Sequence, residues 1–153
     1  MQTNTMTLRE LTIRYSAKKG SDGQPVIIGK TVIRPMDAVP ALMAVLQDEA
    51  NEVFAILCLT TKYRVIGYHE VTRGTLNATL VEPRGVFAAA LLAHAAAIIA
   101  VHLHPSGDPT PSPDDFEVTH RLAAAGRLLG IDLLDHIILG DYRYCSLKEI
   151  GRL

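Results

Sequence analysis

A short apolar run, residues 96–101, ends in His102-Leu103-His104-Pro105 and constrains the fold of this chain more than any other feature. An uninterrupted apolar run of this length is typical of a strand buried on both faces of a sheet. Pro105 has no backbone N–H and therefore ends the strand. Ser112-Pro113-Asp114-Asp115 then fits the start of a helix, with serine at the N-cap and proline at the first position. A buried strand, a turn and a capped helix in succession predict an α/β domain.

The rest of the sequence predicts a sheet with helices packed against it. Alternating or continuous apolar runs indicate strands, and apolar residues at helical spacing indicate helices. The order of these elements predicts a mixed β-sheet with flanking helices, in one domain over residues 1–153, with residues 1–6 as a loose N-terminus. The expected strands are 8–16, 26–34, 52–60, 63–74, 96–104, 131–139 and 142–147, and the expected helices are 36–50, 83–95 and 112–130.

The composition excludes two classes of function. The formal net charge is −1 and no block of Lys and Arg is longer than two residues, so we expect no strong direct binding of nucleic acid. The apolar stretch at 86–101 is interrupted by His94 and is too short to span a bilayer. The N-terminus has no basic region followed by an apolar one, so no signal peptide is indicated. We therefore expect a cytoplasmic protein that does not enter a membrane.

The two histidines at the end of the apolar run indicate a metal site. Residues i and i+2 of a strand share a face, so His102 and His104 are expected to project together. Asp115 in the first turn of the next helix is close enough to supply a third ligand. Two histidines and a carboxylate, with a fourth position left for water, are the ligands of a catalytic zinc. The alternative is that Ser112 and Asp115 serve only as a helix cap.

Several strings of residues carry a resemblance to a known family. His102-x-His104, seven residues and then Ser112-x-x-Asp115 resembles the JAMM motif of the MPN (JAB) metalloprotease superfamily. The RadC-like branch is indicated by further strings, which are RGTLN at 73–77, EPRGVF at 82–87 and LLDHIILG at 133–140. The resemblance covers roughly residues 50–150. It implies the three-layer architecture of MPN and cytidine-deaminase-like domains, here in a short stand-alone form without the helical, DNA-associated region of full-length members.

The resemblance also implies a set of site residues. Zinc would be held by His102, His104 and Asp115, with water in the fourth place, and Ser112 would donate a hydrogen bond to a developing oxyanion. A glutamate from an earlier strand would act as general acid/base, and the matching position is Glu70.

Other residues compete for roles at this site. Glu52 at the start of a strand and Glu82 at the start of a helix are alternative bases, although both have structural explanations, and Glu70 can be a plain surface residue. His136 either orients a ligand or is a strand histidine with a backbone partner, and we prefer the second interpretation.

The function that follows is a zinc-dependent hydrolase, a metallopeptidase or isopeptidase acting on a peptide or protein substrate. The alternative is a catalytically silent MPN scaffold, or an accessory protein associated with DNA repair. A homodimer is possible for either. A zinc nucleobase deaminase is excluded, because its HxE and PCxxC motifs are absent from the sequence.

Overall fold

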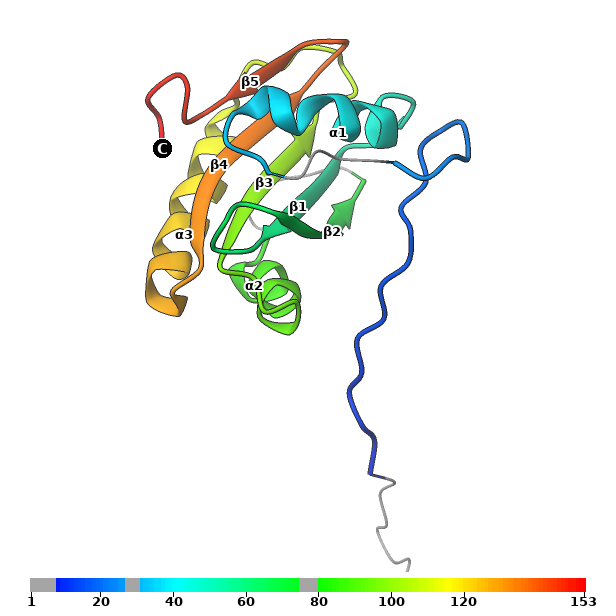
Figure 1. Cartoon of the computed structure of the whole chain (residues 1–153). Helices are drawn as coiled ribbons and strands as arrows, with labels where there is room; N and C mark the ends of the chain where they lie inside the picture. The colour runs from blue at the N-terminus through cyan, green and yellow to red at the C-terminus, as the bar shows by residue number, and fades with distance from the viewer. Residues whose placement is uncertain (1–7, 27–30, 75–79) are drawn as a thin grey trace, which may run out of the picture.

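The computed structural model describes residues 8–26, 31–74 and 80–153, and they form an α/β domain built on one five-stranded mixed sheet. The strand order is β2-β1-β3-β4-β5, and helices cover both faces of the sheet (Figure 1). This arrangement confirms the predicted fold class. The elements are η1 Pro35–Asp37, α1 Val39–Leu46, β1 Val53–Leu59, β2 Val65–Arg73, α2 Pro83–Leu92, β3 Ala97–Leu103, α3 Pro113–Leu129, β4 Asp132–Leu139 and β5 Tyr144–Ser146.

The strands β1 and β3 form the centre of the sheet, and every residue in both is buried. They pair antiparallel, whereas β3 and β4 pair parallel and are connected through α3. Alternate residues divide between two cores, because successive side chains of a strand point to opposite faces. Phe54 and Ala100 pack under α2 and α3, and Ala55 and Val101 pack under α1. The apolar run that precedes His102 is therefore buried on both faces of the sheet, as predicted.

A bulge in β4 changes which of its residues share a face. Ile98 pairs with Leu133, but Ile99 pairs with Asp135, so Leu134 is an extra residue on β4. Because of this insertion, Asp135 faces the α1 side of the sheet with Ile99. The next residue, His136, pairs with Ala100 and faces the side of α2 and α3.

The helices agree with the sequence in their starts more than in their ends. The helix α3 begins after Ser112 and ends at Gly130, whose φ of 70° is the left-handed conformation that favours glycine. The helix α2 begins at Pro83 as expected, but its last residue is Leu92 rather than residue 95. The expected helix 36–50 is wrong in extent, because a 3-10 turn at 35–37 precedes a shorter helix, α1.

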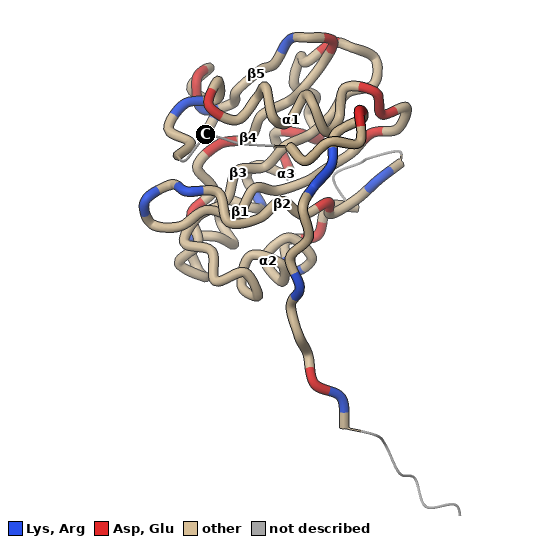
Figure 2. The backbone as a smooth tube through the Cα atoms, turned by 45° about the vertical axis from the view of Figure 1, so that its right-hand side comes forward, with Lys and Arg blue, Asp and Glu red and all other residues tan. Residues whose placement is uncertain are grey.

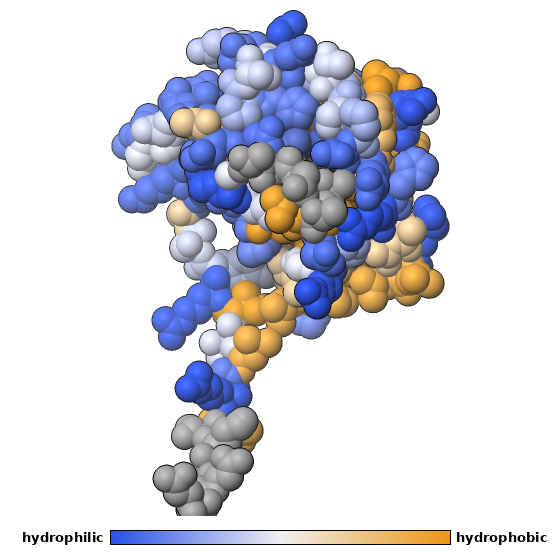
Figure 3. All heavy atoms as spheres, turned by 180° about the vertical axis from the view of Figure 1, so that it is seen from behind, coloured by the Kyte–Doolittle hydropathy of each residue, from blue (hydrophilic) through white to orange (hydrophobic). Residues whose placement is uncertain are grey.

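The two strands expected before residue 35 are not found where the structure describes the chain. Residues 8–18 have no regular secondary structure. Residues 12–15 lie beside β2 and α2, and the chain before them runs away from the body of the domain (Figure 1). Residues 31–34 are also not a strand, and residues 27–30 lie outside the described residues. The alternation of Leu11 and Ile13 with polar residues predicts a strand only where a neighbouring strand can pair with it. Here the two side chains are 76% and 43% exposed, and the segment pairs with no strand. Apolar side chains gather where this segment joins the body (Figure 3).

In the part of the chain that the structure describes, no helix combines the length and the apolar character that crossing a membrane requires.

Candidate metal centre

The site begins where β3 ends, with the two histidines of the sequence motif. His102 pairs with Phe54 of β1 and is 4% exposed. His104 follows the last residue of β3, and its backbone N–H donates to the carbonyl oxygen of Leu139 over 2.9 Å. The two imidazole rings lie 4.5 Å apart, centroid to centroid, at an interplanar angle of 90°. Both rings therefore meet on one side of the sheet, as the spacing predicts.

The turn after His104 is attached to the neighbouring turn after β4. Gly107 has a φ of 85°, and its carbonyl oxygen accepts hydrogen bonds from the backbone N–H of Asp141 and from Arg143 Nη2. A Cβ atom at Gly140 would overlap the backbone of Gly107, so the two turns approach as closely as only glycine allows. The same turn supplies the carbonyl oxygen of Asp108, which lies 2.8 Å from His104 Nδ1.

The start of α3 brings the carboxylate of Asp115 to both histidines. Asp115 Oδ1 lies 2.6 Å from His102 Nδ1, and Asp115 Oδ2 lies 3.4 Å from His104 Nε2. Ser112 donates to Oδ2 through its backbone N–H and its hydroxyl, over 2.7 and 2.9 Å, and its Oγ accepts from the Asp115 N–H. The cap and the contact with the histidines therefore use the same carboxylate, so the two interpretations of Ser112 and Asp115 are compatible.

The charge of this cluster follows from its contacts. Burial alone would raise the pKa of Asp115, but hydrogen bonds from His102 and His104 outweigh burial and hold that pKa well below its usual range. The hydrogen bond to Asp115 raises the pKa of His104, against the opposing effect of burial. Asp115 is thus an anion in the interior, only 3% exposed, and it attracts a cation at this point.

His136 is a member of the cluster that the sequence alone did not assign to it. It has no exposed surface, and its Nδ1 lies 2.7 Å from the hydroxyl of Thr119 rather than from a backbone group. Burial lowers the pKa of His136 to about 3, so the ring is neutral. Ligand atoms of His102, Asp115 and His136 all lie within 4.8 Å of one another, and this buried group could hold a metal ion.

Two orphaned nitrogens support the fit of a metal ion to these residues. His102 Nε2 and His136 Nε2 are both buried without a hydrogen-bond partner among the described residues. A buried ring nitrogen with no partner loses its hydration without compensation. Imidazole nitrogens and a carboxylate are also the donors that zinc and similar divalent ions prefer. The identity of the ion is not fixed by these donors, because they suit several divalent metals.

The structure separates the three glutamates that compete for the role of base. Glu52 directly precedes β1, and its Oε2 lies 3.9 Å from His102 Nε2. Glu70 pairs with Ala55 and therefore lies on the α1 face of the sheet, opposite His102. Arg73 donates to both carboxylate oxygens of Glu70 over 2.7 and 2.8 Å, and this contact lowers the pKa of Glu70. Glu70 is not brought to the histidines, and its catalytic role stays a prediction.

Glu82 has the structural position that the sequence indicated. It is the N-cap residue of α2, and its Oε2 lies 3.9 Å from Arg121 Nη2.

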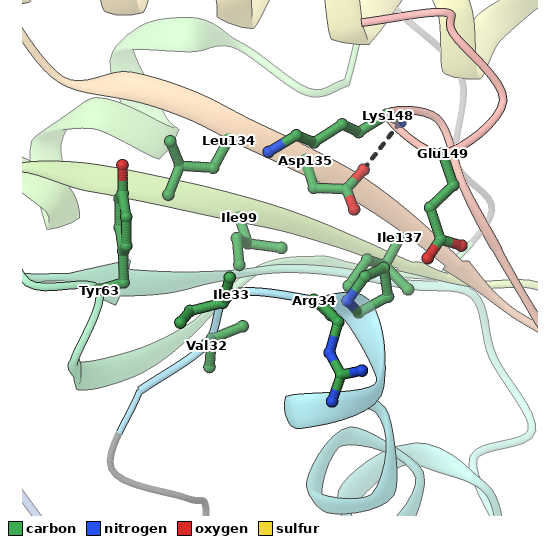
Figure 4. A pocket seen from close by; sticks show the side chains of 11 residues that line it. Val32, Ile33, Arg34, Tyr63, Ile99, Leu134, Asp135, Ile137, Lys148 and Glu149 are labelled. Atoms are coloured by element: carbon green, nitrogen blue, oxygen red, sulfur yellow. Dashed lines mark hydrogen bonds between the residues drawn. The ribbon is translucent and has the colours of Figure 1, made fainter.

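A separate pocket of about 390 Å³ lies on the other face of the sheet (Figure 4). Ile99, Ile137 and Leu134 line it from β3 and β4, and Arg34 and Lys148 stand at its edge. Asp135 also lines this pocket, but its carboxylate accepts from Ser146 Oγ over 2.6 Å and from the backbone N–H groups of His136 and Lys148. Asp135 therefore fastens the C-terminal turn to β4, and the pocket does not open onto the histidines.

Known proteins share this sequence over most of its length. The chain matches the RadC-like JAB domain family over residues 32–152. It is 51% identical over 123 residues to a UPF0758 protein of Halalkalibacterium halodurans, which covers 80% of this chain and 53% of that protein. It is 44% identical over 122 residues to a UPF0758 protein of Methanosarcina barkeri, covering 80% of this chain and 53% of that protein. A UPF0758 protein of Desulfitobacterium hafniense is 40% identical over 149 residues, which is 97% of this chain and 66% of that protein.

The fold and the site together define an α/β domain in which a buried group of histidines and a carboxylate at the end of a central strand could hold a metal ion. The chain belongs to the RadC-like JAB domain family, as the strings around the two histidines predicted. It spans between about half and two thirds of the length of these relatives, 53 to 66%.

Proposed function

We propose that this domain is a metal-dependent hydrolase of peptide or isopeptide bonds, with zinc held by His102, His104 and Asp115. The observation that carries the proposal is the convergence of two imidazoles on one buried carboxylate, at 2.6 and 3.4 Å. This donor set leaves a fourth position for water, as catalytic zinc requires. When bound, zinc lowers the pKa of its water to about 7 and polarises a substrate carbonyl group.

His104 is prepared for this role by its backbone contact. The carbonyl oxygen of Asp108 can only accept, so the 2.8 Å contact requires a hydrogen on His104 Nδ1. Without a metal, Nε2 faces Asp115 and can carry a second hydrogen, and an ion that binds there would displace this hydrogen and use the lone pair of Nε2. A ligating histidine is commonly oriented in this way by a hydrogen bond from its other nitrogen.

Glu52 is the base that the geometry favours. A general base must lie within reach of the water that it deprotonates, either directly or through one intervening water. The carboxylate of Glu52 lies 3.9 Å from a ring nitrogen of His102, on the edge of the cluster. Glu70 was the prediction from the sequence, but its carboxylate is occupied by Arg73 on the opposite face. We therefore propose that Glu52 takes the proton from water and passes it to the leaving amine.

Ser112 can donate to a developing oxyanion without releasing Asp115. Its hydroxyl has one hydrogen, which points to Asp115 Oδ2 over 2.9 Å. The backbone N–H of Ser112 holds the same oxygen over 2.7 Å, so Oδ2 keeps a donor when the hydroxyl turns to substrate. A hydroxyl that turns in this way stabilises the charge that forms on the substrate oxygen.

A peptide or protein substrate fits the charge of the domain better than a nucleic acid does. The net charge is −1, and Figure 2 shows Lys and Arg interspersed with Asp and Glu over the described chain. Tight binding to a phosphate backbone needs a concentration of positive charge on one face.

Metal content and hydrolysis, measured together, test this function. The protein is purified without added metal, its metals are counted by mass spectrometry, and the zinc-loaded form is assayed on a panel of peptide and isopeptide substrates. We expect one ion per chain in the parent, weaker zinc binding by calorimetry and no turnover in His102→Ala, and parental behaviour in His120→Ala, a matched change of an exposed histidine on α3. Equal zinc affinity in His102→Ala would refute the metal assignment. A zinc-loaded parent that cleaves no member of the panel would favour the silent scaffold.

A further inference from the structure

His136 is a buried histidine that the proposed zinc ligands leave unused. It lies on β4 beside β3, and its ring is 6.4 Å from the ring of His102 at an interplanar angle of 29°. Its Nε2 has no hydrogen-bond partner within the described part of the chain, although the residue is fully buried. An unpartnered polar atom in such a position is costly and needs an explanation.

The contacts of Thr119 determine which nitrogen of His136 carries the hydrogen. Thr119 Oγ1 lies 2.6 Å from the carbonyl oxygen of Asp115, which can only accept, so the hydroxyl gives its single hydrogen to that oxygen. The same Oγ1 lies 2.7 Å from His136 Nδ1 and must accept there. The neutral ring therefore has its hydrogen on Nδ1 and a lone pair on Nε2. This is the form in which histidine binds a metal ion.

The ring of His136 lies beside two of the proposed zinc ligands. Atoms of His102, Asp115 and His136 that can bind a metal are all within 4.8 Å of one another. The exposed fractions of these three residues are 4%, 3% and 0%. The side chain of His104 is 13% exposed, so it stands on the solvent side of the cluster. The cluster therefore has an inner and an outer set of three ligands, and His102 and Asp115 belong to both.

We propose that the centre has two overlapping positions for one divalent ion, and this inference rests on the proposed metal site but not on hydrolysis. The outer position uses His102, His104 and Asp115. The inner position uses His102, Asp115 and His136. A neutral imidazole has one lone pair for a metal, and both positions use His102, so only one position is filled at a time. The inner position is enclosed by buried side chains, and an ion held there is stored out of reach of a substrate.

The inner position is tested by measuring zinc binding in variants that lack His104, the ligand unique to the outer set, or His136, the ligand unique to the inner set. The probe is Zn²⁺, titrated against a chromophoric chelator, and Co²⁺ absorption reports the ligand shell. We expect His104→Ala to keep one ion per chain with affinity roughly 10- to 100-fold below the parent. Adding His136→Leu to His104→Ala should remove the remaining binding, and His120→Ala should match the parent.

Thr119→Val provides a second test in case His136→Leu prevents folding, because valine has nearly the shape of threonine. In the His104→Ala background it removes the acceptor of His136 Nδ1–H, and we expect a further loss in zinc affinity of about 10-fold, with unchanged circular dichroism. The proposal is overturned if His104→Ala binds zinc as poorly as His102→Ala, or if neither His136→Leu nor Thr119→Val weakens the binding that His104→Ala retains. None of these titrations depends on turnover, so an inactive parent leaves the test intact.

Discussion

Two clusters in this domain each join a carboxylate to a basic side chain, but one cluster is buried and the other is exposed. The histidine cluster consists of His102, His104, Asp115 and His136, and all of them except His104 are buried. The arginine cluster, Arg73, Glu70 and Glu49, lies at the surface, with side chains that are 40%, 27% and 31% exposed. Arg73 contacts both carboxylates there. Water can replace a lost hydrogen bond at the surface but not in the interior. Loss of a contact should therefore cost more free energy in the histidine cluster than in the arginine cluster.

The largest difference is expected in catalysis. Glu52→Gln should lower turnover by about 100- to 10,000-fold while zinc content stays at one per chain, because glutamine cannot accept a proton at neutral pH. Glu70→Gln, the matched change in the arginine cluster, should leave turnover within a few-fold of the parent. Both variants are compared with the parent by steady-state kinetics, on the substrate identified from the panel of peptides and isopeptides. The reverse ranking would return the role of base to Glu70.

Removal of the buried carboxylate is expected to destabilise the metal-free protein. Asp115→Ala removes the partner of His102 and the acceptor of the Ser112 N–H, and we expect a loss of about 2 to 4 kcal/mol in the free energy of unfolding. Glu49→Ala in the arginine cluster should cost less than about 1 kcal/mol. Urea denaturation in the presence of a chelator measures both changes. Equal losses would mean that the two clusters are equally solvated.

Zinc is expected to stabilise the fold through the histidine cluster alone. At a zinc concentration about 100-fold above Kd, the parent should gain about 2.7 kcal/mol in the free energy of unfolding. Glu70→Ala should show the same gain, whereas Asp115→Asn should show little, because it removes charge from the ligand set. Thermal melts with zinc and with chelator compare the three proteins. A full gain in Asp115→Asn would exclude that residue as a ligand.

The smallest expected effect is a pH-dependent change in the free energy of unfolding when Arg73 is removed from the arginine cluster. The contact with Arg73 lowers the pKa of Glu70 below its unfolded value of about 4.3, so the contact contributes stability above that pH and loses it as the pH falls through the folded pKa. Arg73→Ala should therefore be less stable than the parent by under about 1 kcal/mol at pH 7. Below about pH 4 the two unfolding free energies should converge. A difference that grows on acidification would contradict this assignment.

The sequence predicted the parts of the site that are local in the chain. His102, His104 and Asp115 meet because a strand, a turn and a capped helix follow one another, and each has its own residue signal. Glu52 could not be placed in the same way, because it reaches His102 only through the antiparallel pairing of β1 with β3. Glu70 lies on the opposite face for the same kind of reason, since its place follows from its pairing with Ala55.

The bulge in β4 explains why the place of His136 was missed. Strict alternation from Leu133 would put Asp135 on the same face and His136 on the other. The extra residue Leu134 reverses this, and no turn residue in the sequence marks it. The N-terminal segment gives the opposite lesson, because Leu11 and Ile13 alternate correctly with polar residues but pair with no strand.

The close approach of Gly107 and Gly140 restricts how a metal ion would reach the histidines. The turn that supports His104 is held by hydrogen bonds from Asp141 and Arg143, so it cannot swing outward without breaking them. If the site holds an ion, we expect its entry and exit to depend on the rotation of an imidazole rather than on the opening of this turn. A larger residue at position 140 would push the two turns apart, and we expect it to shorten the residence time of a bound ion without touching a ligand.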